Sequence, residues 1–358
     1  MLPNDHPLNT GRTSSSPLIL NMRGVRTRPL PVWFMRQAGR SLPEYRKMRE
    51  NIPMLDSCLT PDVAAEITLQ PVRRHHVDAA IFFSDIVIPL KLSGIDVDIK
   101  PGVGPVISEP VRTQSDIQRL RELGDIDLSP ITEAVRILCA ELGNTPLIGF
   151  GGAPFTLASY LIEGGPSRDL PHSRHMMTHD PTLWSTILSW CADVTATFIQ
   201  AQVLAGASAL QVFDSWAGKL DPKEYLKFAL PHSRRLFDQL TPLVDGQGEP
   251  VPRVHFGLGT QKILTQMHSA GATVMGVDFH TPLTAAQDLL GSSVPLQGNI
   301  NPALLTAPWS EIRAHLDDVL DQGASSPGHI VNLGHGVPPE TDPDVLTRIV
   351  EYVHLASA

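Results

Sequence analysis

Pro31-Val-Trp-Phe-Met-Arg36-Gln-Ala-Gly-Arg40 is a stretch whose character changes halfway along its length. Residues 32–35 are apolar, include two aromatics and follow two closely spaced prolines, a pattern that predicts a buried strand. Two arginines then follow, four residues apart. A buried strand that ends in two guanidinium groups places fixed positive charge at one edge of a sheet, where a multiply charged anion could bind.

The positive charge is concentrated around this stretch. Between Arg23 and Arg49 the chain has eight basic residues and one acid, a local balance of +7, whereas the 358 residues together carry a net charge of −9. Because the chain as a whole is mildly acidic, we expect no nucleic-acid partner. A small acidic molecule bound by the local basic patch agrees better with this distribution.

The cysteines and the hydropathy pattern indicate a cytoplasmic protein. Cys58, Cys139 and Cys191 lie far apart and form no CxxC pair, so we expect no disulfide framework. We find no apolar run of membrane-spanning length, and Met1 is not followed by the pattern of a secretion signal. The sequence therefore predicts a cytoplasmic location and no membrane partner.

The first residues differ in composition from the rest. Residues 1–22 are rich in Pro, Asn, Thr and Ser, which predicts a flexible N-terminal leader outside the core. We see no linker that divides the remainder, so residues 23–358 are expected to form one catalytic domain.

Short apolar strands alternate with helical segments along that domain. The expected strands cover 32–35, 78–83, 147–150, 209–213, 254–257, 273–277, 295–297 and 329–333. The expected helices cover 43–50, a segment from 61 onward, 114–123, 130–142, 180–205, 222–240 and 342–355, and 97–107 is expected to form a hairpin. Alternation of this kind predicts parallel βαβ units, and eight of them predict a (β/α)₈ TIM barrel, an α/β fold.

Nearly every expected strand ends at a polar residue or a glycine. These residues are Arg36, Asp85, Gly151, Asp214, Gly257, Asp278, Asn299 and His335. The C-terminal strand ends of a (β/α)₈ barrel form its active-site face, so we expect these residues to converge on one mouth.

Several motifs resemble those of the uroporphyrinogen decarboxylase family. Phe34-Met-Arg-Gln-Ala-Gly-Arg40, followed by Leu42-Pro-Glu-Tyr-Arg46, is similar to its N-terminal signature. A second signature and further segments match in the same order, over roughly 28–355: Gly149-Phe-Gly-Gly-Ala-Pro-Phe-Thr156 with Tyr160, Phe83-Ser-Asp85, Phe213-Asp-Ser-Trp-Ala-Gly218, Leu296-Gln-Gly-Asn299 and Asn332-Leu-Gly-His-Gly336.

The resemblance implies a homodimeric, single-domain barrel that removes CO₂ from the four acetate side chains of uroporphyrinogen. The product would be coproporphyrinogen, an intermediate of haem biosynthesis, and neither a cofactor nor a metal would take part. The catalytic residues implied are Arg36, Asp85 and Tyr160. The substrate-binding residues implied are Arg36, Arg40, Asp85, Tyr160, Ser215 and His335. The chain departs from the common family residues at Ser41, Phe279 and Asn301, none of which is among these six.

The two arginines suit a substrate with many carboxylates. A guanidinium offers bidentate donors and stays charged at any working pH. The alternative is a structural ion pair, for which Glu44 and Asp56 are the nearby candidates.

Asp85 at a strand end could accept hydrogen bonds from pyrrole N–H groups and stabilise the cation formed when a pyrrole is protonated. The proton donor stays open between an arginine and a carboxylic acid of the substrate. The alternative role of Asp85 is to cap the helical segment that follows it.

Tyr160 and Ser215, taken alone, could equally be hydroxyls satisfied at helix ends. His335 lies between two glycines, which would let a ligand approach the backbone closely, and its imidazole could bind a carboxylate or carry a proton. A loop histidine bonded to a backbone carbonyl is the alternative.

Other functions find less support in the sequence. A zinc-dependent methyltransferase on a related barrel would need a histidine two residues before a cysteine, and none of the three cysteines has one. His172, His175 and His179 have helical spacing, but no carboxylate or cysteine completes a metal site. An aldolase would need a lysine at a strand end, and Lys219 lies in a loop. A tetrapyrrole carrier on the same barrel differs from the decarboxylase only in lacking turnover.

Overall fold

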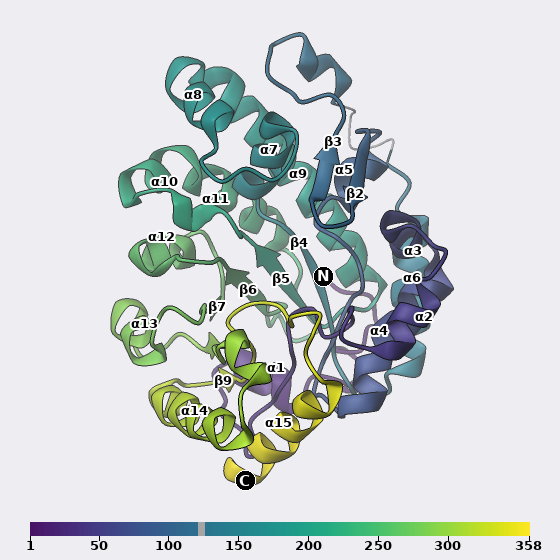
Figure 1. The fold of residues 1–358 in the computed structure, drawn as a ribbon, viewed down its shortest axis with the longest axis vertical. Coiled ribbons are helices and arrows are strands. Elements are labelled where there is room, and N and C mark those ends of the chain that lie inside the picture. Colours follow the sequence, from purple (N-terminus) through teal and green to yellow (C-terminus); the bar gives the residue numbers. More distant parts are fainter. Residues whose placement is uncertain (121–125) are drawn as a thin grey trace.

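The computed structural model describes residues 1–120 and 126–358, and its centre is a parallel sheet of seven strands. The strands lie in the order β1, β4, β5, β6, β7, β8 and β9. Their bounds are Ala80–Ile81, Leu147–Gly152, Ala209–Phe213, Arg253–Phe256, Val274–Gly276, Leu296–Gln297 and His329–Ile330. Figure 1 shows these strands in the middle of the molecule with the helices arranged around them. The predicted α/β barrel class is confirmed.

The eighth predicted strand is reduced to a short bridge. Val32 pairs with Val331 in parallel, and the Val331 N–H donates to the Pro31 carbonyl at 2.9 Å. On the other side the Asp78 N–H donates to the Val32 carbonyl at 2.8 Å. Residues 31–33 therefore lie between β9 and β1, but a continuous ladder does not form, because Pro31 has no N–H to donate.

Most of the predicted helices form, but the structure also contains helices that were not predicted, among them those at 154–163, 264–269, 283–290 and 309–322. Their bounds are α1 Pro17–Met22, α2 Pro43–Met48, α3 Met54–Leu59, α4 Pro61–His75, α5 Ile88–Leu92, α6 Ser129–Glu141, α7 Pro154–Glu163, α8 Pro171–His179, α9 Pro181–Ala205, α10 Pro222–Phe228, α11 Leu230–Leu240, α12 Leu264–Ser269, α13 Leu283–Leu290, α14 Trp309–Gln322 and α15 Pro343–Ala356. The predicted hairpin is confirmed as β2 Val97–Lys100 paired antiparallel with β3 Gly104–Ile107.

Two of the predicted helices differ. The helix expected over 222–240 is two helices, and Pro231 in the first turn of the second explains the break at Ala229. Within the helix expected over 114–123, the structure has a 3₁₀ turn at Asp116–Arg119, and residues 121–125 lie outside the described residues.

Polar side chains connect the bridge segment to the sheet inside the barrel. The Trp33 indole N–H donates to Gln297 Oε1 at 3.2 Å, and Gln297 Nε2 donates to Gln211 Oε1 at 2.9 Å. All three residues are buried. Because buried polar groups that find partners hold their neighbours in fixed positions, this chain fixes the segment before Arg36 against β8 and β5.

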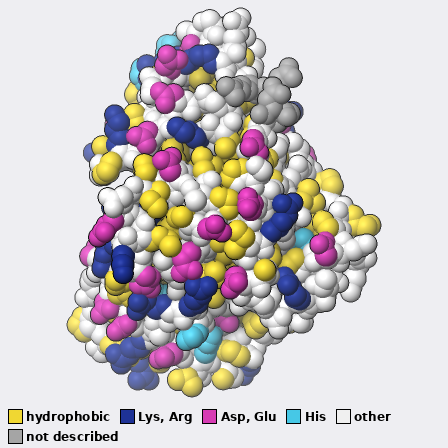
Figure 2. Space-filling view, turned by 90° about the vertical axis from the view of Figure 1, so that its right-hand side faces the viewer, with side chains coloured by type: hydrophobic (Ala, Val, Ile, Leu, Met, Phe, Trp, Pro, Cys, Tyr) yellow, Lys and Arg dark blue, Asp and Glu magenta, His cyan; other side chains and the backbone are white. Residues whose placement is uncertain are grey.

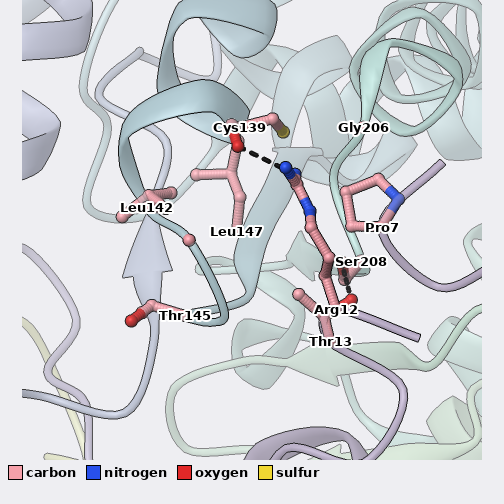
Figure 3. Close-up of a pocket in the computed structure, with 10 residues that line it drawn as sticks. Pro7, Arg12, Thr13, Cys139, Leu142, Thr145, Leu147, Gly206 and Ser208 are labelled. Atoms are coloured by element: carbon pink, nitrogen blue, oxygen red, sulfur yellow. Dashed lines mark hydrogen bonds between the residues drawn. The ribbon is translucent and has the colours of Figure 1, made fainter. Parts of the chain in front are cut away.

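Residues 1–22 pack against the core. The prediction that this segment lies outside the core is therefore wrong. Leu2, Leu8 and Leu18 are buried and join the main hydrophobic cluster. Figure 3 shows this segment beside the start of β4, where the Arg12 guanidinium donates to the Cys139 carbonyl at 2.8 Å. A cavity of about 10 Å³ remains between them, which is room for one water molecule. The polar composition of residues 1–22 gave a wrong prediction because a few leucines among the polar residues are enough to join the core. How far the segment moves stays a prediction.

Helix α9 corrects the expectation that the chain has no apolar run of membrane-spanning length. With 25 residues and a mean hydropathy of 1.2 over its most apolar window, it is long and apolar enough to cross a membrane. However, 61% of that window is buried inside the molecule, so α9 is interpreted as a core helix.

The surface has charges of both signs. Figure 2 shows one face on which apolar side chains gather around the middle while basic and acidic side chains alternate about them. No broad area of positive charge appears on this face.

Candidate active site

Arg36 lies at a sharp turn that its neighbours hold in place. The Gln37 side chain accepts the Phe34 N–H at 2.9 Å and donates to the Ala79 carbonyl at 3.0 Å. Arg36 itself has φ = 60°, in the left-handed region that a residue with a side chain rarely adopts. Such a conformation is kept where the surroundings hold it, and it is common at functional sites.

Gly336 makes room for the Arg36 side chain. A Cβ atom at this position would lie 2.4 Å from Arg36 Cδ. Sequence reasoning assigned the glycines around His335 to close approach by a ligand, whereas this glycine allows close approach by an arginine. The loop after β9 therefore packs against the arginine at the end of the bridge segment.

Neither Arg36 nor Arg40 forms a side-chain ion pair with any residue in the described ranges. Both are exposed. Glu44, the expected structural partner, instead binds Arg74 on α4 at 2.7 Å. Two guanidinium groups thus face solvent without a carboxylate, which favours ligand binding over a structural role.

The neighbouring basic residues serve the fold. Arg23 pairs with Asp245 at 2.8 Å, and Arg26 donates to the Gly323 carbonyl at 2.9 Å. Arg46 donates to the Arg40 carbonyl at 2.7 Å. Part of the local positive charge therefore stabilises the fold, whereas Arg36 and Arg40 form no ion pair within the described ranges.

Asp85 follows β1 and is half-buried. Burial raises the pKa of its carboxyl, while a hydrogen bond from the Val87 N–H and the Arg36 cation act to lower that pKa. Oδ1 accepts the Val87 N–H at 3.0 Å, which closes a turn just before α5. Asp85 therefore does not cap α5 itself but closes the turn before it, and this role uses one of its two carboxylate oxygens.

Tyr160, on α7, lies near this carboxylate. Burial raises the pKa of its phenol to about 12, with the Asp85 charge raising it further and the Arg36 charge opposing. Its ring lies 4.2 Å from the Trp216 ring, measured between centroids. At neutral pH the phenol is therefore a hydrogen-bond donor beside Asp85 and Arg36.

His335, in the loop after β9, also interacts with Arg36. Burial lowers the pKa of its imidazole, the Arg36 cation lowers it further, and Asp278 opposes. Asp278 follows β7 and is itself held by the Thr281 hydroxyl at 2.8 Å and by the Gly259 N–H. The imidazole is thus kept neutral beside the free arginine.

Of the other five predicted residues, three interact electrostatically with Arg36: Asp85, Tyr160 and His335. Ser215 is exposed and directly precedes Trp216. The Arg40 side chain is also exposed, and within the described ranges it forms no ion pair or hydrogen bond with the cluster. Sequence reasoning missed Trp216 as a neighbour of the site, although its place directly after Ser215 was a usable signal.

The other candidate groups lie elsewhere. His175 and His179 stack on α8 with ring centroids 4.1 Å apart, and no group of three His, Cys, Asp or Glu residues suited to a metal occurs among residues 1–120 and 126–358. Lys219 donates to the carbonyls of Ser167 and Arg168, at 2.6 and 2.8 Å. Its ammonium is therefore bound to the backbone, as expected for a lysine without a Schiff-base role.

Known proteins resemble this chain closely. The family model described as uroporphyrinogen decarboxylase (URO-D) matches residues 13–355. A protein named uroporphyrinogen decarboxylase from an Arthrobacter species is 58% identical over 97% of this chain and 99% of its own length. One of the same name from Streptomyces avermitilis is 53% identical over the full length of both chains.

The solved structures support the fold. A methyltransferase from Methanosarcina mazei aligns with a TM-score of 0.76 over 97% of this chain and 99% of its own, at 18% sequence identity. A B12-independent methionine synthase from a Shewanella species aligns with a TM-score of 0.54 at 11% identity. At these identities the likeness concerns the fold alone.

Proposed function

We propose, because this chain belongs to the uroporphyrinogen decarboxylase family, that the cluster around Arg36 and Asp85 is where it removes carboxyl groups from its substrate. The chain is a carboxy-lyase of porphyrin biosynthesis, which converts uroporphyrinogen to coproporphyrinogen. The observation that carries the choice of site is the Arg36 guanidinium, which forms no ion pair within the described ranges and interacts electrostatically with the half-buried Asp85 carboxylate after β1.

In this proposal Arg36 and Arg40 bind substrate carboxylates. Uroporphyrinogen carries eight of them around four pyrrole N–H groups, so it needs cations at the rim and an acceptor at the centre. The guanidinium groups supply the first by bidentate hydrogen bonds. The free oxygen of Asp85 supplies the second, while Ser215 and His335 complete the polar rim.

The chemistry follows from the substrate's own ring. Protonation of a pyrrole carbon beside an acetate arm gives a cation; the C–CO₂ bond then breaks, and its electron pair flows into the ring to leave an exocyclic methylene. A second proton adds to this methylene to give a methyl group, and the ring proton is lost. Asp85 stabilises the cationic ring, and the neutral phenol of Tyr160 stands beside it as a hydrogen-bond donor.

We also propose that the reaction needs no cofactor and no metal, because the protonated pyrrole is itself the electron sink. A cytoplasmic location and a homodimer are proposed on the family resemblance. A second copy would shield apolar side chains such as those gathered on the face in Figure 2.

Anaerobic incubation with uroporphyrinogen, followed by chromatography of the oxidised products, tests the function. We expect coproporphyrin to accumulate through products that have lost one, two and three carboxyl groups. Tight binding of the substrate without any of these products would contradict a decarboxylase and indicate a tetrapyrrole carrier.

A further inference from the structure

A chain of contacts runs from a buried carboxylate to the ring beside Tyr160. Asp214 directly follows β5, and its Oδ1 accepts the hydroxyl of Thr156, on α7, at 2.8 Å. The Thr156 oxygen in turn accepts the backbone N–H of Trp216 at 3.3 Å. The Trp216 ring lies against the Tyr160 ring, tilted by 31°. Asp214 and Thr156 are fully buried, so neither can reach the substrate.

The direction of these hydrogen bonds is determined by the chemistry of the groups. A threonine hydroxyl has one hydrogen to donate, and an ionised carboxylate can only accept. Thr156 must therefore donate to Asp214, which leaves its lone pairs for the Trp216 N–H. This bond of 2.8 Å between two fully buried residues holds the hydroxyl in a single orientation.

The second oxygen of Asp214 faces His255, on β6. The distance from Oδ2 to Nε2 is 3.6 Å, both residues are fully buried, and neither atom has a hydrogen-bond partner within the described ranges. His255 Nδ1 lies 3.2 Å from the Met267 carbonyl, so Nδ1 carries a hydrogen.

We propose that Asp214 and Thr156 are positioning residues for the decarboxylation, and that they act through Trp216 to hold the Tyr160 ring beside Asp85. The inference rests on the proposed function of the site. Tyr160 lies on the same helix as Thr156, one turn further on, so the helix and the β5 exit are held together at the point where the phenol enters the cluster. A hydroxyl moved by about 1 Å from its productive position commonly costs on the order of 10² in rate.

Variants of Thr156 test the inference on the full-length protein. Thr156→Val keeps the shape and removes the hydroxyl, and Thr156→Ser keeps the hydroxyl. Thr195→Val is the matched control, because Thr195 is also fully buried and its hydroxyl donates to the Gly152 carbonyl at 3.0 Å, away from Trp216. We expect kcat to fall about tenfold in Thr156→Val, the loss of about one hydrogen bond, and to stay within about twofold of wild type in the other two.

A double-mutant cycle with Tyr160→Phe separates positioning from general destabilisation. If Thr156 acts through Tyr160, Thr156→Val should add less than about a twofold loss of kcat in the Tyr160→Phe background. Losses that multiply, or equal kcat values for Thr156→Val and Thr195→Val at equal melting temperatures, would overturn the inference. A wild-type protein without turnover would instead overturn the proposed function, and the inference with it.

Discussion

At the scale of single residues, Arg36 and Arg40 differ from structural arginines such as Arg23 because neither forms a side-chain ion pair within the described ranges. Sequence reasoning left Glu44 open as a structural partner, and proximity in the chain could not decide the matter. The actual partner of Glu44 is Arg74, thirty positions away on α4, with a contact of 2.7 Å. Which arginines are free is therefore decided by tertiary packing, whereas the presence of a basic strand end could be predicted from the local sequence.

Replacing either arginine by alanine should weaken substrate capture and leave stability almost unchanged. We expect KM for uroporphyrinogen to rise in Arg36→Ala and Arg40→Ala, because each removes a bidentate carboxylate donor without breaking an ion pair. Arg23→Ala is the matched control: Arg23 pairs with Asp245, so its loss should lower the melting temperature and spare KM. An unchanged KM together with a large fall in melting temperature for Arg36→Ala would contradict the binding role.

The pH dependence should report on Asp85. Its carboxyl must be ionised to accept pyrrole N–H groups, and burial raises its pKa, so kcat/KM should fall on the acid side at a pH above that of an ordinary aspartate. The Arg36 cation acts to lower this pKa. Arg36→Ala should therefore move the acid limb to higher pH, as measured in a pH profile of kcat/KM. If the acid limb of the Arg36→Ala profile stayed in place or moved to lower pH, the titrating group would not be Asp85.

At the scale of elements, the sequence pattern was enough to predict the barrel, the hairpin and several of the helices around the sheet, but not α7, α12, α13 or α14. Two features were less accessible. The bridge at Val32 falls short of a strand because Pro31 lacks an N–H, and the break at Ala229 follows from Pro231. Both prolines are visible in the sequence. Their effects could have been predicted if proline positions had been given more weight than the pattern of apolar residues.

Helix α15 should be pH-sensitive in its attachment. His354 contacts Asp78 at 2.8 Å, and Asp78 also accepts the Val32 N–H at 2.7 Å, so this pair connects the last helix to the bridge segment. The hydrogen bond with Asp78 raises the pKa of His354 above its ordinary value of 6.5. The stabilisation is then fully present below about pH 6.5 and is lost as pH rises through the folded-state pKa.

The corresponding measurement is the melting temperature as a function of pH. His354→Gln can still donate to Asp78 but cannot titrate, so the loss of stability between mildly acidic and mildly alkaline pH should be smaller than in wild type. His179→Gln, at the exposed end of α8, should behave as wild type. Equal pH dependence in wild type and His354→Gln would show that the pair does not anchor the helix.

At the scale of the whole molecule, the N-terminal segment is where composition failed most clearly. Prolines, serines and threonines favoured a leader outside the core, yet Leu2, Leu8 and Leu18 are buried in the main hydrophobic cluster. A composition average cannot detect this, because three buried leucines contribute little to it while removing a large apolar area from water.

Unfolding by denaturant can test this packing directly. Leu8 is 4% exposed, so Leu8→Ala should lower the free energy of unfolding by about 2–5 kcal/mol, as for other buried leucines. Leu355, at 80% exposure, provides the matched control, and its replacement should cost less than about 0.5 kcal/mol. Similar small costs for both variants would mean that the segment is mobile in solution.

The residues of the candidate site could be predicted from the sequence, whereas the contacts that hold Tyr160 in place could not. Strand-end positions and the family motifs indicated Arg36, Asp85, Tyr160 and His335, because these depend on the order of elements. The contact between Tyr160 and Trp216, and the buried Asp214 behind it, depend on how α7 meets β5, which no local pattern describes.

The most direct test of decarboxylation at this cluster is the CO₂ released per uroporphyrinogen under anaerobic conditions, by protein dialysed against a strong chelator. We expect wild type to release four equivalents at an undiminished rate, and Asp85→Asn to keep its melting temperature while its rate falls on the order of 10²–10³, the usual effect of losing one preorganised electrostatic partner. Near-wild-type release of CO₂ by Asp85→Asn, or activity lost on chelation and restored by zinc, would contradict a cofactor-free reaction at Asp85.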